Sequence, residues 1–225
     1  MHSRIATIVT LLMSALAPLA AQQGVVGGIA VDLASGRPLP CISVELIDSV
    51  GHPFASTRTR FAGDFEFLAP PQGDYRFRFS GLGLASVETV PEALTPSSEF
   101  ERSFRIALTL LDTIAREEQL ALRDSTEIPR FIPGKGSPLY PMRLREKRTH
   151  GVVIIGYAVT DRGRVHVGSA IPLHASHPDF MRAVERSLPD LRFHPARIAD
   201  APACMFRTGS YLFSLDGVVG YIEIG

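Results

Sequence analysis

Short stretches of alternating apolar and polar residues fill the first half of the chain. In residues 75–80 three aromatic residues alternate with Arg76, Arg78 and Ser80, as in a strand with one buried and one wet face. Other segments that suit strands are 25–31, 42–46, 65–68 and 104–110. Because turn residues such as Gly and Pro separate them, the pattern predicts an antiparallel β-sandwich over residues 24–114.

The second half has a different rhythm. Residues 152–160 are rich in β-branched side chains, a turn follows at Asp161-Arg162-Gly163, and residues 164–171 alternate, which together indicate a hairpin. Residues 178–188 carry apolar side chains at helical spacing after Pro178, and a third strand is expected over 205–215. The expected order is β-β-α-β over residues 138–225, so the predicted fold class is mostly β plus α+β.

Between these halves, residues 115–137 are expected to form a short helical segment and a linker. Residues 116–124 favour a helix, whereas Pro129 and Pro133-Gly134 end it. A linker between two self-contained patterns leads us to expect that each half folds alone.

The N-terminus indicates export. A basic start precedes an apolar run from Ile5 to Ala17, and small residues follow up to Ala21, so residues 1–21 are expected to be a signal peptide. The alternative is an uncleaved anchor, because residues 5–21 reach the lower length limit of a spanning helix. The expected location is the periplasm or cell envelope, with membrane association only if this segment stays uncleaved.

The charge balance and the cysteine content exclude few kinds of partner and leave the state of the cysteines open. Lys plus Arg number 23 and Asp plus Glu number 23, so the overall charge balance gives no reason to expect nucleic acid, anionic lipid or a strongly charged substrate as the partner. Four arginines of the first half, Arg58, Arg60, Arg76 and Arg78, are interpreted as parts of solvated strand faces with nearby carboxylates, the alternative being a basic binding patch. Cys41 and Cys204 fall in different predicted domains, so we expect two unpaired thiols, although an oxidising compartment permits a disulfide.

The residue patterns give no support for catalysis. His174 and His177 could suggest a metal site, but no HExxH motif or paired cysteines accompany them. The chain also lacks a nucleophile elbow and a glycine-rich phosphate loop. We therefore predict a protein that is not an enzyme and needs no cofactor or metal.

Motifs in the first half resemble the carboxypeptidase regulatory-like domain. They are Gly27-Gly28-Ile29, Ser35-Gly36-Arg37-Pro38-Leu39-Pro40, Val44-Glu45-Leu46, Gly63-Asp64-Phe65 and Gly73-Asp74-Tyr75. The resemblance implies a transthyretin-like β-sandwich that acts as an accessory or spacer domain, without catalysis.

Motifs in the second half resemble the C-terminal domain of TonB energy transducers. They are Tyr140-Pro141, Leu144-Arg145, Gly151-Val152-Val153, Val159-Thr160-Asp161-Arg162-Gly163, Ser176-His177-Pro178 and Arg192-Phe193-His194-Pro195. The resemblance implies a protein-interaction domain that adds the TonB box of an outer-membrane receptor to its last strand, by β-augmentation. The corresponding edge here is Phe206, Arg207, Thr208, Gly209, Ser210, Tyr211, Leu212, Phe213 and Ser214.

Departures from the TonB pattern shape the functional hypothesis. The anchor is expected to be removed, and the chain has no proline-rich stalk. We therefore favour an envelope protein that binds a protein partner by strand addition. The alternatives are a membrane-anchored TonB energy transducer, and a sandwich that binds glycans or small ligands.

Residues beyond these motifs predict that the chain covers its own sheet edge. Asp216-Gly217 is a hairpin signal, and residues 218–224 have the content of another strand. An unpaired edge invites aggregation, so we expect this C-terminal strand to pair with 206–214 and to require displacement before a partner strand binds. The alternative is a frayed tail.

Overall fold

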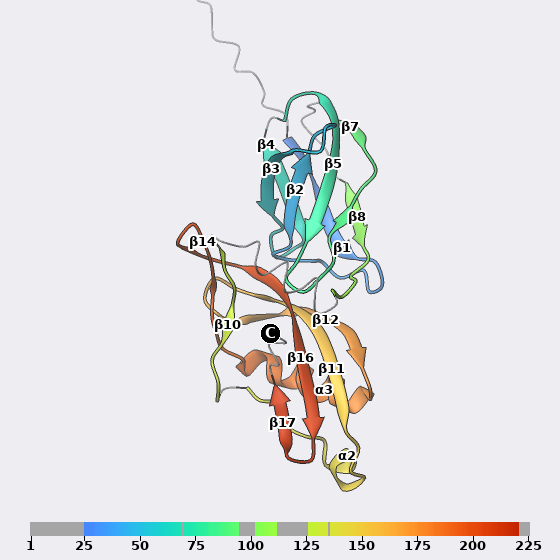
Figure 1. Cartoon of the computed structure of the whole chain (residues 1–225), viewed down its shortest axis with the longest axis vertical. Coiled ribbons are helices and arrows are strands. Elements are labelled where there is room, and N and C mark those ends of the chain that lie inside the picture. Colours follow the sequence, from blue (N-terminus) through green and yellow to red (C-terminus); the bar gives the residue numbers. More distant parts are fainter. Residues whose placement is uncertain (1–24, 69, 95–101, 112–125, 135, 221–225) are drawn as a thin grey trace, which may run out of the picture.

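The computed structural model describes residues 25–68, 70–94, 102–111, 126–134 and 136–220, and two β-rich halves follow one another along its long axis (Figure 1). The predicted signal peptide and the helix predicted at 116–124 lie outside these residues. No helix among the described residues is long and apolar enough to cross a membrane.

The first half is a β-sandwich, as predicted. One sheet has the order β4-β1-β8 and the other the order β3-β2-β5-β6, with β7 also pairing with β5. The strands are β1 (Val25–Asp32), β2 (Ser43–Ile47), β3 (Pro53–Arg58), β4 (Asp64–Leu68), β5 (Gly73–Ser80), β6 (Val87–Glu88), β7 (Glu92–Leu94) and β8 (Ser103–Ile106). Pairing is antiparallel except between β1 and β8, which run parallel.

Phenylalanines from both sheets fill the space between them. Phe65 and Phe104 lie on one sheet, and Phe77 and Phe79 project from β5, with ring centroids 4.9–5.9 Å apart across the sheets. On the wet face of β5, Arg78 pairs with Glu45 at 3.0 Å and Glu88 at 2.8 Å. This arginine is therefore neutralised on the strand face by carboxylates from neighbouring strands.

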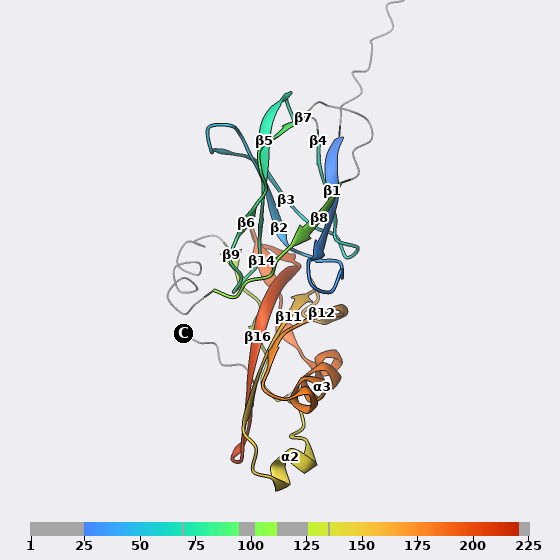
Figure 2. The same cartoon turned by 90° about the vertical axis from the view of Figure 1, so that its right-hand side faces the viewer.

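The second half is built on a four-stranded sheet of order β12-β11-β16-β17. Its strands are β11 (Gly151–Val159), β12 (Val165–Ala175), β16 (Met205–Ser214) and β17 (Gly217–Gly220). A short helix α2 (Met142–Glu146) precedes β11, and helix α3 (Pro178–Ser187) lies against one face of the sheet (Figure 2). A 3-10 turn (Leu188–Asp190) and the small strands β13 (Phe193–His194), β14 (Ala196–Ile198) and β15 (Ala201–Ala203) complete the β-β-α-β core.

Helix α3 begins as the sequence predicts. His177 is its N-cap, since its Nδ1 accepts a hydrogen bond from the Asp179 N–H at 3.1 Å, and Pro178 follows in the first turn. Phe180 is fully buried and stacks on Phe213 of β16, with ring centroids 4.3 Å apart. This pair fixes the helix to the sheet.

The segment predicted as a linker is paired with the second half. Strand β9 (Thr126–Glu127) pairs with β14, and β10 (Arg130–Phe131) pairs with β13. The buried Arg207 of β16 donates a hydrogen bond to the carbonyl of Pro129. Residues 126–131 therefore pack on the second half, because their backbone groups find partners there that no local sequence signal specifies.

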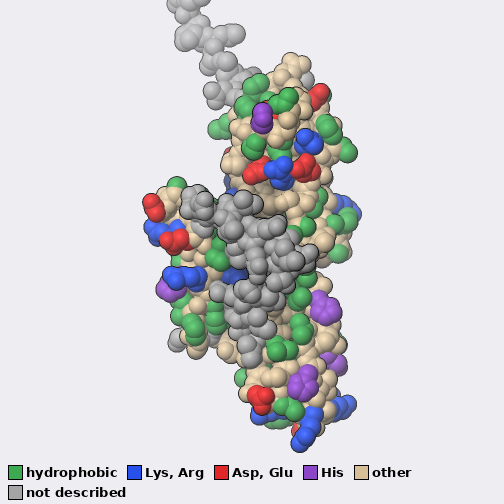
Figure 3. Space-filling model, viewed as in Figure 1, with side chains coloured by type: hydrophobic (Ala, Val, Ile, Leu, Met, Phe, Trp, Pro, Cys, Tyr) green, Lys and Arg blue, Asp and Glu red, His purple; other side chains and the backbone are tan. Residues whose placement is uncertain are grey.

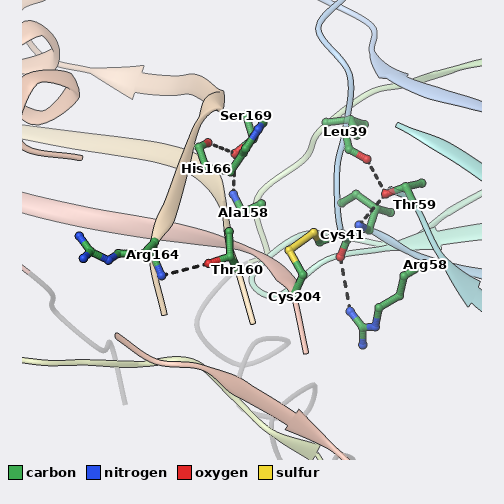
Figure 4. The surroundings of a disulfide bond; sticks show 11 residues. Leu39, Cys41, Arg58, Thr59, Ala158, Thr160, Arg164, His166, Ser169 and Cys204 are labelled. Atoms are coloured by element: carbon green, nitrogen blue, oxygen red, sulfur yellow. Dashed lines mark hydrogen bonds between the residues drawn. A yellow bond between two sulfur atoms is a disulfide. The ribbon is translucent and has the colours of Figure 1, made fainter. Parts of the chain in front are cut away.

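The prediction of two unpaired thiols is wrong. Cys41 and Cys204 form a disulfide, with an S–S distance of 1.99 Å and a Cα–Cα distance of 5.6 Å (Figure 4). Cys41 lies in a turn held by the buried Thr59, whose hydroxyl accepts from the Ile42 N–H at 3.0 Å and donates to the Leu39 carbonyl at 2.6 Å. The prediction failed because it assumed separate domains, whereas Cys204 lies directly before β16, which reaches into the sandwich.

The two halves share a core at this junction. Phe206 is fully buried in the cluster that contains the sandwich phenylalanines, together with Ala158 of β11 and Ile171 of β12. Arg37 of the sandwich donates to the Ala170 carbonyl at 2.6 Å, and Phe61 stacks on His166 with centroids 4.7 Å apart. The junction thus combines apolar burial, polar contacts and a covalent bond.

An irregularity in β12 shapes its side of the junction. Pairing with β11 jumps from Gly156↔Ile171 to Ala158↔His166, so residues 167–170 bulge out of the ladder. The Ser169 hydroxyl fills the gap, because it accepts from the Ala158 N–H at 2.8 Å and donates to the His166 carbonyl at 2.5 Å. The bulge places Ala170 within reach of Arg37.

Candidate functional site

The candidate site is the outer edge of β16, the edge that faces away from β11. Along a strand, backbone N–H and C=O groups point alternately to the two neighbouring strands. The outward-pointing groups of β16 include those of Phe206 and Thr208, which bond to residues outside the sheet. By the same alternation, the backbone N–H and C=O groups of Leu212 and Ser214 point outward, toward β17.

The sandwich closes the first part of this edge. The Phe206 N–H donates to the Cys41 carbonyl at 3.2 Å, and its carbonyl accepts from the Leu82 N–H at 3.1 Å. The Thr208 N–H donates to the Leu82 carbonyl at 3.2 Å. Leu82 thus lies parallel to β16 as a short bridge. Two residues of the predicted edge, Phe206 and Thr208, are already bonded to the first half, and Arg207 lies between them opposite Leu82.

The close approach of this bridge depends on a glycine. Gly83 has φ +79°, and a Cβ at this position would lie 2.3 Å from the Thr208 Oγ1. A larger residue would be strained by its backbone and would push the bridge away from β16. Neither Leu82 nor Gly83 was predicted as part of the site, because only the packing of the two halves brings them to β16.

Strand β17 closes the last part of the edge. It pairs antiparallel with β16 from Ser214↔Gly217 to Tyr211↔Gly220. The loop is Leu215-Asp216, one residue earlier than the predicted Asp216-Gly217, and Gly217 adopts φ +144° as the first residue of the strand. The predicted covering strand is therefore present up to Gly220, and the rest of the predicted range lies outside the described residues.

The middle of the edge lies between these two covers. Gly209 and Ser210 follow the last bond to Leu82 and precede the first pair with β17. A Cβ at Gly209 would lie 2.8 Å from the Tyr157 hydroxyl, so a glycine is needed for the backbone of β16 to pass this buried ring. Among the residues that the structure describes, the cover from the sandwich and the cover from β17 leave an interval of two residues, Gly209 and Ser210.

The inner face of β16 is firmly held. Tyr211 is almost fully buried, and its hydroxyl lies near Tyr157. Burial raises the pKa of the Tyr211 hydroxyl well above its usual value, with Tyr157 adding to the rise, so the side chain is neutral. The guanidinium of Arg207 lies 5.7 Å from the Phe193 ring centroid. Exchange of a strand on the outer edge would leave this packing in place.

The histidines do not form a metal centre in the part of the chain that the structure describes. No group of three His, Cys, Asp or Glu residues there could hold a metal ion. His177 serves instead as the N-cap of α3. A groove of about 390 Å³ lies between residues 136–142 and α3, lined by residues that include Leu139, Met142 and Arg186.

Comparison with known proteins does not show a family. No family model matches the chain, and no curated protein matches it. Solved structures with a weak likeness include the TonB C-terminal domain of Pseudomonas aeruginosa, at 22% identity and a TM-score of 0.32, covering 40% of this chain and 87% of that one. The TonB resemblance therefore stays a prediction.

Two other weak likenesses cover more of the chain. A putative carbohydrate binding protein from Bacteroides uniformis is 8% identical with a TM-score of 0.33, and covers 84% of this chain and 86% of that one. The major pilin subunit BcpA of Bacillus cereus is 11% identical with a TM-score of 0.32, and covers 89% of this chain and 67% of that one.

Proposed function

We propose that this chain is an exported, non-enzymatic binding protein of a bacterial cell envelope that takes up an extended segment of a protein partner at the outer edge of β16. The observation that supports this most is the β16–β17 hairpin, in which a short terminal strand occupies the place of a partner strand. Strand addition supplies backbone hydrogen bonds along an edge, and side-chain pockets then select the sequence.

Strand β17 is suited to displacement. It has four residues, and Gly217 and Gly220 contribute no side chains. Val218 is partly buried against the core of the second half. A partner strand would replace the backbone hydrogen bonds of β17 like for like, so the cost of exchange is chiefly the partial burial of Val218, about 1 kcal/mol. A partner with a larger apolar side chain at that register would offset this cost.

The stretch available after displacement is Gly209 to Ser214. Phe206 and Thr208 remain bonded to Cys41 and Leu82, and the disulfide keeps the sandwich beside β16. The predicted edge is thereby shortened from nine residues to six. We expect a partner segment of about that length in extended conformation.

The test removes β17 and measures binding of a synthetic peptide that carries the TonB box of an outer-membrane receptor. Truncation after Leu215 is expected to raise the affinity of the peptide about tenfold or more, because the tethered competitor is gone. Fluorescence anisotropy of the labelled peptide measures this change. Equal binding by the truncated and intact chains would contradict the proposal.

A point variant separates displacement from other effects of truncation. Val218→Asp places a charge in the partly buried site of β17 and is expected to raise the affinity in the same direction. Val90→Asp makes the same change on the sandwich, where Val90 is 74% exposed, and is expected to leave peptide binding unchanged. An equal gain in both variants would assign the effect to net charge.

A further inference from the structure

The end of the molecule farthest from the sandwich carries a cluster of cations. Four exposed residues on α2 and the turn after it form this tip: Arg143, Arg145, Lys147 and Arg148. Figure 3 shows Lys and Arg side chains gathered at this end, where Figure 1 places α2. Among the described residues, none of the four has a carboxylate within 4.0 Å, and the one acidic residue on the helix is Glu146.

Large apolar side chains protrude beside these cations. Leu139 is 84% exposed and Met142 is 69% exposed, in contrast to the burial that such residues normally reach. Both line the groove between residues 136–142 and α3. That groove also contains Asp179, which pairs with Arg182, as well as Arg186 and Asp190, so the excess positive charge lies on the tip itself.

The tip is held in place by the core of the second half. Leu144 is buried beneath α2. The Tyr140 ring packs against Phe180 and Phe213, with centroids 5.6 and 5.7 Å away, and its hydroxyl donates to the Thr149 carbonyl. These contacts anchor both ends of the segment 140–149, so Met142 and the cations are presented by an ordered support.

We propose that this tip docks on the surface of a bilayer that contains anionic phospholipids. Lys and Arg side chains near such a surface are attracted by its negative potential, and adjacent apolar side chains insert at the boundary of headgroups and acyl chains. An acidic protein would match the charges, but would not account for the two protruding apolar side chains, Leu139 and Met142. The proposal uses residues separate from the β16 edge and stands independently of the proposed function.

The charge contribution is tested by Arg143→Gln/Arg145→Gln. Flotation of the full chain with phosphatidylcholine vesicles containing phosphatidylglycerol measures the partition coefficient. We expect a loss of about fivefold per cation, or about twenty-five-fold for the pair. The matched control is Arg162→Gln/Arg164→Gln, which removes two exposed charges at the opposite end of β11 and is expected to leave binding unchanged. All variants keep residues 1–21, so that segment contributes equally.

The contribution of the exposed apolar side chains distinguishes binding to a bilayer from binding to an acidic polymer. Met142→Ser is expected to lower binding to the anionic vesicles about threefold or more, and to leave binding to immobilised polyglutamate unchanged. Equal losses in the tip variant and its control, or vesicle binding that does not depend on phosphatidylglycerol, would overturn the proposal. Stronger retention of the tip by polyglutamate than by the vesicles would also overturn it, in favour of an acidic protein partner.

Discussion

Replacement of both cysteines with alanine is expected to lower the free energy of unfolding by about 3–5 kcal/mol. The disulfide joins residues that are 163 positions apart, so it restricts the unfolded chain strongly. It also fixes Cys41 beside Phe206, whose N–H bonds to the Cys41 carbonyl. Denaturant unfolding of the purified double variant, followed by circular dichroism, measures the change.

Two controls make this result specific. The unaltered chain, unfolded in the presence of reductant, should lose a similar amount of stability. The double variant should not change when reductant is added. A difference of less than about 1 kcal/mol between the oxidised chain and the double variant would contradict a structural role for the bond.

Phe206→Ala is expected to destabilise the folded chain by about 3–5 kcal/mol, the usual cost of removing a fully buried aromatic ring. Its ring belongs to the sandwich core although its backbone belongs to β16. Because loss of the ring would leave a cavity at the junction of the two halves, both halves should lose stability together. Probes placed in each half should therefore report one shifted transition.

The matched control is Phe54→Ala. Phe54 is 47% exposed and makes an edge contact with Tyr75, so its loss should cost less than about 1.5 kcal/mol. If Phe206→Ala destabilised only one half, or cost no more than Phe54→Ala, the shared core would not couple the two halves. The expectation that each half folds alone would then be favoured.

Local sequence patterns predicted the elements that depend on local chemistry. The alternation in residues 75–80 predicted the buried face of β5, and Pro178 with the following apolar spacing predicted α3. These features follow from periodicity and capping, which act over a few residues. The C-terminal hairpin was predicted for the same reason, with its loop displaced by one residue.

Features that depend on contact between the halves could not be predicted in this way. The pairing of Cys41 with Cys204, the burial of Phe206 and the bridge at Leu82 all require the relative placement of two distant segments. The TonB-like motifs indicated that β16 is a candidate edge, but nothing near Leu82 indicates that it bonds to Thr208. Similarly, residues 126–131 lack a strand pattern. They form strands because their backbone groups pair with β13 and β14, which lie far away in the sequence.

The contacts between the two halves determine which part of the β16 edge is covered. The sandwich fixes the start of the β16 edge through Leu82 and the disulfide, while β17 covers the end through a short strand with two glycines. One cover is secured by the disulfide, and the other is a strand of four residues. We therefore expect partner exchange at the β17 end, with the sandwich serving as a fixed stop for the incoming strand.

Residue-resolved amide hydrogen exchange of β16 tests this account most directly. In the intact chain, the Leu212 and Ser214 amides should be protected by β17, and truncation after Leu215 should speed their exchange while Phe206 and Thr208 stay protected. Addition of the TonB-box peptide to the truncated chain should restore protection at Leu212 and Ser214. Protection of these two amides that is unchanged by truncation, or that the peptide fails to restore while it binds elsewhere, would contradict a strand-accepting edge on β16.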